Sequence, residues 1–174
     1  WDTSPSAQVY RSDAASAVIN GRLYVCGGES GNPDSPSTSL DCFDPLLGIW
    51  QTLPSMSQGR KDHAAAVNEA RLYVCGGWSD DRRLESTEVF DTVTNTWQSL
   101  PAMTRPRRLA GAAVIRAHVY MVGGDGSSPS SERLPPKGNW QELPRMHEAR
   151  EDFSTAVIAD RLYVCGGFDK ISVE

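Results

Sequence analysis

Leu23-Tyr24-Val25-Cys26-Gly27-Gly28 is an apolar run that ends in two glycines, and it decides how this chain of 174 residues folds. Runs of the same kind, each with a tyrosine four residues before its second glycine, occupy residues 72–77, 119–124 and 162–167. A motif that returns along a chain indicates a repeat protein, in which each unit packs on its neighbours. The sequence is therefore interpreted as copies of one structural unit.

Tryptophans alternate with these glycine pairs. The distance from a tryptophan to the second glycine of the next pair is 27 residues each time, starting from Trp1, Trp50, Trp97 and Trp140. From a glycine pair to the next tryptophan the distance instead changes, from 22 to 20 to 16 residues. A segment of fixed length packs against its copies, whereas a segment of variable length runs over the surface. We therefore expect one scaffold leg and one surface loop in each unit.

Each unit contains signals for four strands and none for a helix. The first strand is an alanine-rich run, such as residues 64–67 in the second unit. A turn follows this strand, and in the first unit the turn contains the hairpin signal Asn20-Gly21. The run into the glycine pair comes next and forms the second strand. Segments such as 42–44 and 50–53 supply the third and fourth strands. Four strands repeated every 43 to 49 residues are typical of a β-propeller blade. We therefore predict an all-β fold, with the alanine-rich strand nearest the axis and the glycines admitting neighbouring backbone or the repeated tryptophan.

The composition argues against several classes of function. The formal net charge is −5 and no basic stripe is present, so contact with nucleic acid is not expected. No apolar run is long enough to span a membrane, and residues 1–5 lack the features of a signal peptide. We therefore expect a cytoplasmic protein that contacts neither nucleic acid nor membrane.

The repeated residues resemble those of the Kelch-repeat β-propellers. The glycine pair with its tyrosine, the Trp-x-x-Leu-Pro-x-Met segment and an arginine ten residues after each tryptophan all match that family; the arginines are Arg11, Arg60, Arg107 and Arg150. The resemblance implies an all-β, Kelch-type β-propeller, here a partial ring of about three and a half to four four-stranded blades. The chain departs from the pattern at residues 131–136, where two prolines predict a weakened or edge strand.

The whole of residues 1–174 is interpreted as one Kelch propeller segment. Residues 1–7 correspond to the tail of a preceding blade, and the repeat units after it cover about 8–56, 57–103, 104–146 and 147–174, the last of them incomplete. Kelch propellers usually close with about five to seven blades. We therefore expect further repeats in a longer protein, or a second copy that supplies them.

The sequence contains no motif for catalysis or for a cofactor. His63, His118 and His147 lie at different places in the repeat, with His63 expected to face a loop, so a shared metal site is not expected. Cys26 and Cys42 lie on strands that should be neighbours, which leaves a disulfide open, although free thiols are favoured. The repeated arginines are expected to bind backbone or acidic groups of their own blades. We therefore expect no enzyme activity and no cofactor.

In Kelch domains that bind substrates, a partner peptide lies over the mouth of the ring. The resemblance assigns this contact to residues just before the inner strands, which are Ser12, Asp13, Lys61, Asp62, Arg108, Leu109, Glu151 and Asp152. It also assigns it to residues just after the glycine pairs, which are Glu29, Trp78, Asp80, Asp125, Ser127, Phe168 and Lys170. Seven of these residues are acidic and three are basic, which predicts a basic partner with an apolar anchor on Trp78 or Phe168.

The resemblance implies a module for protein–protein interaction. It is similar to the Kelch domains of substrate adaptors for cullin-type ubiquitin ligases, which would engage the ligase through domains outside this sequence. An actin-binding or scaffolding Kelch protein is the alternative. A Kelch-type oxidase or sugar isomerase is a more distant one.

Overall fold

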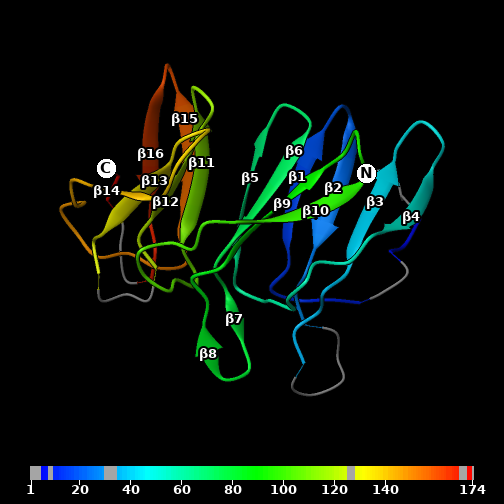
Figure 1. The fold of residues 1–174 in the computed structure, drawn as a ribbon, viewed down its shortest axis with the longest axis horizontal. Helices are drawn as coiled ribbons and strands as arrows, with labels where there is room; N and C mark the ends of the chain where they lie inside the picture. The colour runs from blue at the N-terminus through cyan, green and yellow to red at the C-terminus, as the bar shows by residue number, and fades with distance from the viewer. Residues whose placement is uncertain (1–4, 8–9, 30–34, 125–127, 169–171, 174) are drawn as a thin grey trace.

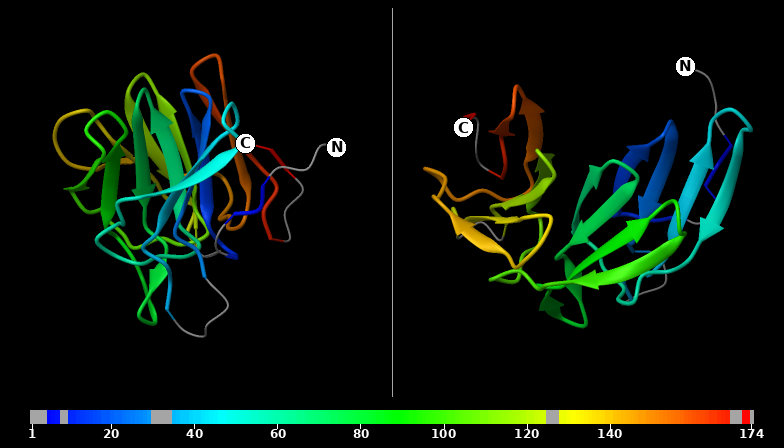
Figure 2. Two further views of the ribbon diagram at one scale, coloured as in Figure 1. Left: turned by 90° about the vertical axis from the view of Figure 1, so that its right-hand side faces the viewer. Right: turned by 45° about the horizontal axis from the view of Figure 1, so that its top comes forward.

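The computed structural model describes residues 5–7, 10–29, 35–124, 128–168 and 172–173. Within these ranges the chain forms sixteen β-strands and no helix, which confirms the all-β prediction. Four sheets, called blades 1 to 4 here, follow one another along an arc (Figures 1 and 2).

Blades 1 to 3 are antiparallel sheets of four strands each, and blade 4 has two strands among the described residues. Blade 1 consists of β1 (Ala15–Ile19), β2 (Arg22–Cys26), β3 (Leu40–Asp44) and β4 (Ile49–Leu53). Blade 2 consists of β5 (Ala64–Asn68), β6 (Arg71–Cys75), β9 (Thr87–Asp91) and β10 (Thr96–Leu100). Blade 3 consists of β11 (Gly111–Ile115), β12 (His118–Val122), β13 (Ser131–Leu134) and β14 (Gln141–Leu143). Blade 4 consists of β15 (Ser154–Ile158) and β16 (Arg161–Cys165), and a short hairpin is formed by β7 (Trp78–Ser79) and β8 (Arg82–Arg83).

The third strand of blade 3 corrects one expectation from the sequence. β13 pairs with β12 on one side and with β14 on the other, so it is an inner strand of the sheet and not an edge. It ends at Leu134, and Pro135 and Pro136 come directly after it. Because prolines outside the ladder remove no backbone donor from it, they shorten the strand to four residues without displacing it.

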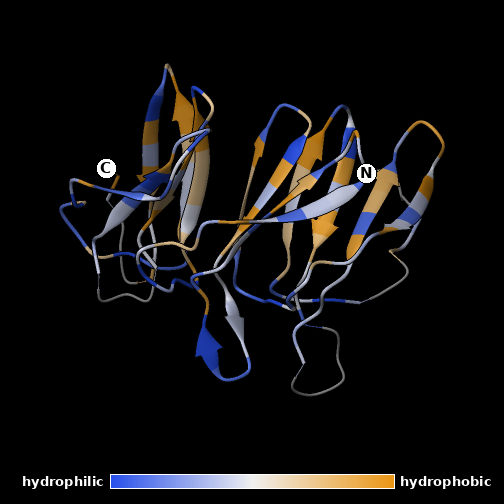
Figure 3. Cartoon of the chain, viewed as in Figure 1, coloured by the Kyte–Doolittle hydropathy of each residue, from blue (hydrophilic) through white to orange (hydrophobic). Residues whose placement is uncertain are grey.

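The first strands of the four blades lie side by side where the blades converge, since β1 contacts β5, β5 contacts β11 and β11 contacts β15. Small residues allow this approach: Ala64 and Ala66 are buried, and a Cβ on Gly111 would lie 2.4 Å from Cγ2 of Thr155. The predicted position of the alanine-rich strand is therefore confirmed. Buried apolar side chains from neighbouring blades pack together in two clusters. Hydrophobic residues are frequent along the strands (Figure 3).

The glycine pairs join each blade to the next one through backbone. The N–H of Gly28 donates to the carbonyl of Arg60 at 2.8 Å, and the N–H of Gly77 donates to the carbonyl of Arg107 at 2.7 Å. A Cβ on Gly76, whose φ is +64°, would lie only 2.4 Å from that same Arg107 carbonyl. Glycine is required because the next blade's backbone approaches here, as predicted.

Neighbouring backbone is thus the one of the two predicted alternatives that approaches the glycine pairs. The repeated tryptophans have other contacts. They reach the preceding outer segment instead: Nε1 of Trp97 donates to the carbonyl of Pro54 at 2.7 Å, and Nε1 of Trp140 donates to that of Pro101 at 3.0 Å. Each indole thus joins two successive units at their outer strands.

The repeated arginines are internal to their blades. Arg60 is fully buried, and it donates to the carbonyl of Gly76 at 2.7 Å and to the carboxylate of Glu88 at 2.7 Å. Arg107 binds Gly123 and Glu132 in the same way. The arginines therefore hold each glycine pair against the third strand and are not available to a partner.

Candidate functional site

The described residues among those expected to contact a partner lie at one end of the blades, which we call the mouth face. The β7–β8 hairpin projects from this end (Figure 1). The segment before each inner strand is bonded to the segment after the same blade's glycine pair: Ser12 pairs with Glu29 and Lys61 pairs with Trp78 as antiparallel bridges. In blade 4 the N–H of Phe168 donates to the carbonyl of Glu151 at 3.0 Å. Residues of the two sets expected from the sequence thus lie together in blades 1, 2 and 4.

One residue in each blade has a left-handed backbone at the start of the inner strand. The φ angles of Asp13, Asp62, Leu109 and Asp152 are 54°, 55°, 52° and 52°. The N–H of Asp62 donates to the carbonyl of Asp13 at 3.1 Å, that of Leu109 to Asp62 at 2.9 Å, and that of Asp152 to Leu109 at 3.0 Å. Aspartate tolerates this backbone far better than leucine does. The result is a chain of backbone hydrogen bonds from blade to blade.

A cavity of about 200 Å³ opens among these four residues. It is lined by Asp13, Asp62, Leu109 and Asp152 together with the residues that follow each of them, Ala14, His63, Ala110 and Phe153. Burial raises the pKa of Asp62, and the negative charge of Asp13 raises it further, while Arg108 and Lys61 act in the opposite direction. We call this space the axial cavity.

A second cavity on the mouth face, of about 470 Å³, is lined by Pro36, Lys61, Trp78, Asp80 and Asp81. Lys61 Nζ lies 2.7 Å from Glu29 Oε2, and this hydrogen bond raises the pKa of the lysine. The lysine is therefore charged at neutral pH and already paired.

Arg108 covers part of the predicted aromatic surface. Its guanidinium carbon lies 4.9 Å from the ring centroid of Trp78, and its Nη1 lies 4.0 Å from Asp62 Oδ2. Trp78 is half-buried, whereas Phe168 is 70% exposed. Phe168 is therefore the more open of the two aromatic residues predicted from the sequence.

The sequence reasoning missed some of the lining residues and named others that the structure does not describe. Pro36 and Asp81 line the larger cavity, and the variable loop that carries Pro36 had no repeat signal to mark it. Phe153 was missed because no other unit has an aromatic carbocycle at this position, where Ala14, His63 and Ala110 stand. Asp125, Ser127 and Lys170 lie outside the described residues.

His63 is buried between blades 1 and 2, which corrects the expectation that it faces a loop. Its Nε2 lies 3.4 Å from Cys26 Sγ. Burial, followed by the charge of Arg60, lowers the pKa of His63 to about 3, and burial raises the pKa of Cys26 to about 12. Both side chains are therefore neutral at pH 7, and the thiol is not an activated nucleophile.

The cysteines are free thiols. Cys26 lies opposite Leu40 in the β2–β3 ladder and Cys42 lies opposite Tyr24, so the two are not bonded to each other. Among the residues that the structure describes, no group of three or more His, Cys, Asp and Glu side chains is arranged to hold a metal ion. The described part of the chain also contains no helix long and apolar enough to cross a membrane.

Comparisons with known proteins agree with the repeat. The model of the KLHDC2/KLHL20/DRC7 Kelch-repeats domain matches residues 1–124. The structure of YjhT is similar to this one with a TM-score of 0.80 at 16% sequence identity, over 92% of this chain and 63% of that chain. At this identity the likeness shows the fold alone, and this chain spans less than two thirds of the YjhT chain. No curated protein matches the sequence.

The predicted fold class, a partial Kelch-type propeller, is confirmed by the sheets and by both matches. The motifs that resemble Kelch repeats have structural roles in this chain. The glycine pairs contact the next blade, the arginines bind within their own blades, and the tryptophans join successive units. The chain belongs to the KLHDC2/KLHL20/DRC7 Kelch-repeat family.

Proposed function

We propose that the mouth face binds a segment of another protein that carries a lysine or arginine beside an apolar residue. Membership of a Kelch-repeat family supports a protein-interaction module in general. The observation that carries the specific proposal is the axial cavity, where Asp13, Asp62 and Asp152 gather around about 200 Å³. Of the neighbouring cations, Lys61 is paired with Glu29, and Arg108 lies over Trp78 with its Nη1 4.0 Å from Asp62 Oδ2.

A cation in the axial cavity would relieve an unfavourable arrangement. Asp62 is partly buried and lies in the field of Asp13 and Asp152, both of which raise its pKa. A ligand cation close to these carboxylates would favour their ionised forms. Cation binding should therefore weaken as the pH falls through the raised pKa of Asp62, because protonation removes the attraction.

An apolar side chain beside the cation has two places to pack. Leu109 and Phe153 line the axial cavity itself. Phe168 is 70% exposed on the mouth face and would gain from being covered. Buried aromatic contacts commonly dominate the affinity of interfaces, while charge complementarity sets orientation and rate.

The experiment measures binding of capped decapeptides, each with one lysine or arginine among uncharged residues, by fluorescence anisotropy. In the double variant Asp13→Asn with Asp152→Asn, the affinity of selected peptides should fall at least tenfold, since asparagine keeps the left-handed backbone but removes the charge. Glu69→Gln is the matched control, because Glu69 also has a positive φ but lies in the β5–β6 turn, at the other end of the strands. Equal affinity for the double variant and the control would reject the proposal.

The proposed biological role is substrate recognition for a ubiquitin ligase, which the resemblance to cullin adaptors supports. The test is affinity purification of the full-length protein with quantification of cullin subunits and other proteins. The aspartate double variant should lose client proteins and retain the cullin. Co-sedimentation with actin filaments and no cullin would favour the scaffolding alternative, and a bound metal with oxidase activity would favour an enzyme.

A further inference from the structure

Arg108 lies between the two cavities of the mouth face. Its guanidinium carbon is 4.9 Å from the ring centroid of Trp78, which lines the cavity of about 470 Å³. Its Nη1 is 4.0 Å from Oδ2 of Asp62, which lines the axial cavity. One side chain thus contacts a lining residue of each cavity. A partner segment that reached both cavities would therefore meet Arg108.

The two cations beside Asp62 make ion pairs of different length. Lys61 Nζ lies 2.7 Å from Glu29 Oε2, which is the distance of a charge-assisted hydrogen bond. The 4.0 Å between Arg108 and Asp62 is too long for a hydrogen bond, so these two groups attract each other without a bond of fixed geometry. A cation that came closer to the Asp62 carboxylate would therefore compete well with Arg108.

Movement of Arg108 away from Asp62 needs only a rotation of its side chain. The adjoining backbone is held in place, because the N–H of Leu109 donates to the carbonyl of Asp62 at 2.9 Å. The side chain of Arg108 is 35% exposed, and exposed side chains change rotamer within nanoseconds. The guanidinium can therefore leave while the walls of both cavities stay where they are.

This rotation would uncover an aromatic ring next to a carboxylate. Arg108 covers the Trp78 ring by a cation–π contact. An apolar side chain of a partner would bury the same ring surface, and covered tryptophans commonly contribute much of the affinity of an interface. Burial and the charge of Asp13 raise the pKa of Asp62, so a cation close to this carboxylate is also favoured.

We propose that Arg108 is an autoinhibitory residue of the mouth face, which the partner's lysine or arginine replaces at Asp62 and the partner's apolar residue replaces on the Trp78 ring. The inference rests on the function proposed above and adds the site of the apolar contact. Arg108 makes the mouth face selective, because a partner needs both the charge and the apolar side chain to take its place. A segment with only one of them leaves one of these positions unfilled.

The test compares two fluorescein-labelled decapeptides by anisotropy, one with lysine beside leucine and one in which serine replaces that leucine. Arg108→Gln should raise the affinity of the lysine–leucine peptide about tenfold, because the competitor is removed from both Asp62 and Trp78. The affinity of the lysine–serine peptide should rise only about threefold, because it gains at Asp62 alone. Equal gains would show that Arg108 acts through its charge only, and no gain or a loss would show that it does not block the site. Either result would overturn the proposal.

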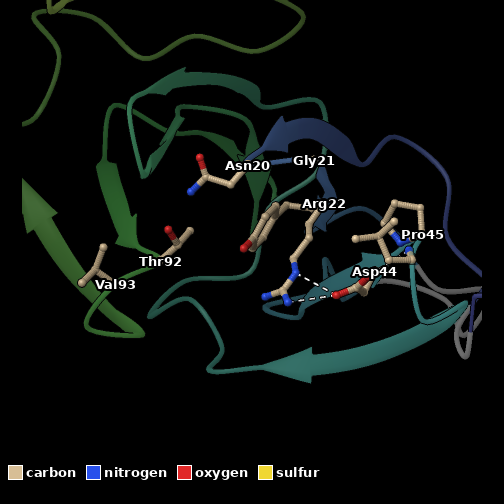
Figure 4. A pocket seen from close by; sticks show the side chains of 9 residues that line it. Asn20, Gly21, Arg22, Asp44, Pro45, Thr92 and Val93 are labelled. Atoms are coloured by element: carbon tan, nitrogen blue, oxygen red, sulfur yellow. Dashed lines mark hydrogen bonds and ion pairs between the residues drawn. The ribbon is translucent and has the colours of Figure 1, made fainter.

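Arg22→Gln is the matched control for Arg108→Gln. The side chain of Arg22 is 53% exposed and pairs with an aspartate, Asp44 (Figure 4). Arg22 begins β2, whereas the glycine pair of the mouth face follows the other end of that strand. The control removes the same charge from the chain, so both peptides should keep their affinity within twofold. Gains as large as those of Arg108→Gln would show that net charge, and not the position of Arg108, is the cause.

The place of Arg108 in the complex is a second readout. The ring current of Trp78 shifts the side-chain resonances of Arg108 in NMR spectra of the free chain, and saturation with the lysine–leucine peptide should remove this shift. A shift that persists in the complex would overturn the proposal. If neither peptide binds the original chain or Arg108→Gln, this proposal and the function proposed above are both rejected. Peptides that bind, lose affinity in the double variant at Asp13 and Asp152, and gain equally in Arg108→Gln reject only this one.

Discussion

Gly76 and Gly21 both have positive φ, but only Gly76 has a neighbour where a side chain would go. A Cβ on Gly76 would lie 2.4 Å from the Arg107 carbonyl, whereas a Cβ on Gly21 would meet nothing within 4 Å. We expect Gly76→Ala to lower the free energy of unfolding by about 2–4 kcal/mol, through clash and backbone strain together. Gly21→Ala should cost only about 1 kcal/mol, from the left-handed backbone. Urea denaturation measures both, and similar losses would contradict the contact with blade 3.

Asp62 makes the stability of the chain depend on pH. Because burial and Asp13 raise its pKa above 3.8, the folded state holds the proton more tightly than the unfolded state does. The ionised group therefore opposes folding at neutral pH, and this cost disappears below about pH 3.8, where both states are protonated. Asp62→Asn should raise the Tm at pH 7 by up to about 3 °C. No gain should remain at pH 3, and a gain of equal size there would show that charge is not its cause.

Single residues also mark the limits of what the sequence could predict. The pairing of Arg11, Arg60, Arg107 and Arg150 with backbone or acidic groups of their own blades followed from their recurrence, since a residue needed in every unit serves the unit. The burial of His63 could not be predicted in that way, because the equivalent positions hold Ala14, Ala110 and Phe153. A unique residue carries no repeat signal, and its surroundings come from the neighbouring blade.

At the scale of elements, the third strands of blades 1 to 3 are tied by ion pairs to the segments that precede their first strands. Glu88 in β9 binds Arg60, which has no exposed surface. Glu88→Ala should lower the free energy of unfolding by about 3–5 kcal/mol, because it leaves a buried guanidinium without its counter-charge. Asp91→Ala, which breaks the exposed pair with Arg71 in the same strand, should cost less than about 1 kcal/mol. Chemical denaturation compares the two, and equal losses would contradict the burial of Arg60.

The elements themselves were largely predictable from the sequence, with one informative error. Apolar runs, turn signals and the constant distance from each tryptophan to the next glycine pair identified the strands, because backbone pairing and burial repeat in every unit. The prolines at residues 135 and 136 were placed inside the third strand of blade 3, whereas the strand ends before them. Strand ends depend on one or two hydrogen bonds and so are poorly encoded by local composition.

At the scale of the whole molecule, the axial cavity draws residues from each of the four blades, because Asp13, Asp62, Leu109 and Asp152 are linked by backbone hydrogen bonds at one end of the strands.

The candidate site was less predictable than the fold. Family resemblance assigned the mouth residues to segments that border the repeated glycine pairs and inner strands, and their contact with a partner stays a prediction. It could not show that Arg108 lies over Trp78 or that Lys61 is bound to Glu29, since both contacts join different blades. Contacts between blades depend on three-dimensional spacing that a single repeat unit does not encode.

The backbone hydrogen bonds that run from Asp13 through Asp62 and Leu109 to Asp152 have a consequence for substitutions at the rim. Peptide groups join successive blades there, in addition to side-chain contacts such as Lys61 with Glu29 and Arg108 with Trp78. An exchange of the side chain at one of these four positions should therefore leave the links between peptide groups in place, provided that the new residue accepts a left-handed backbone. Leu109 shows that a residue without a carboxylate is accommodated there.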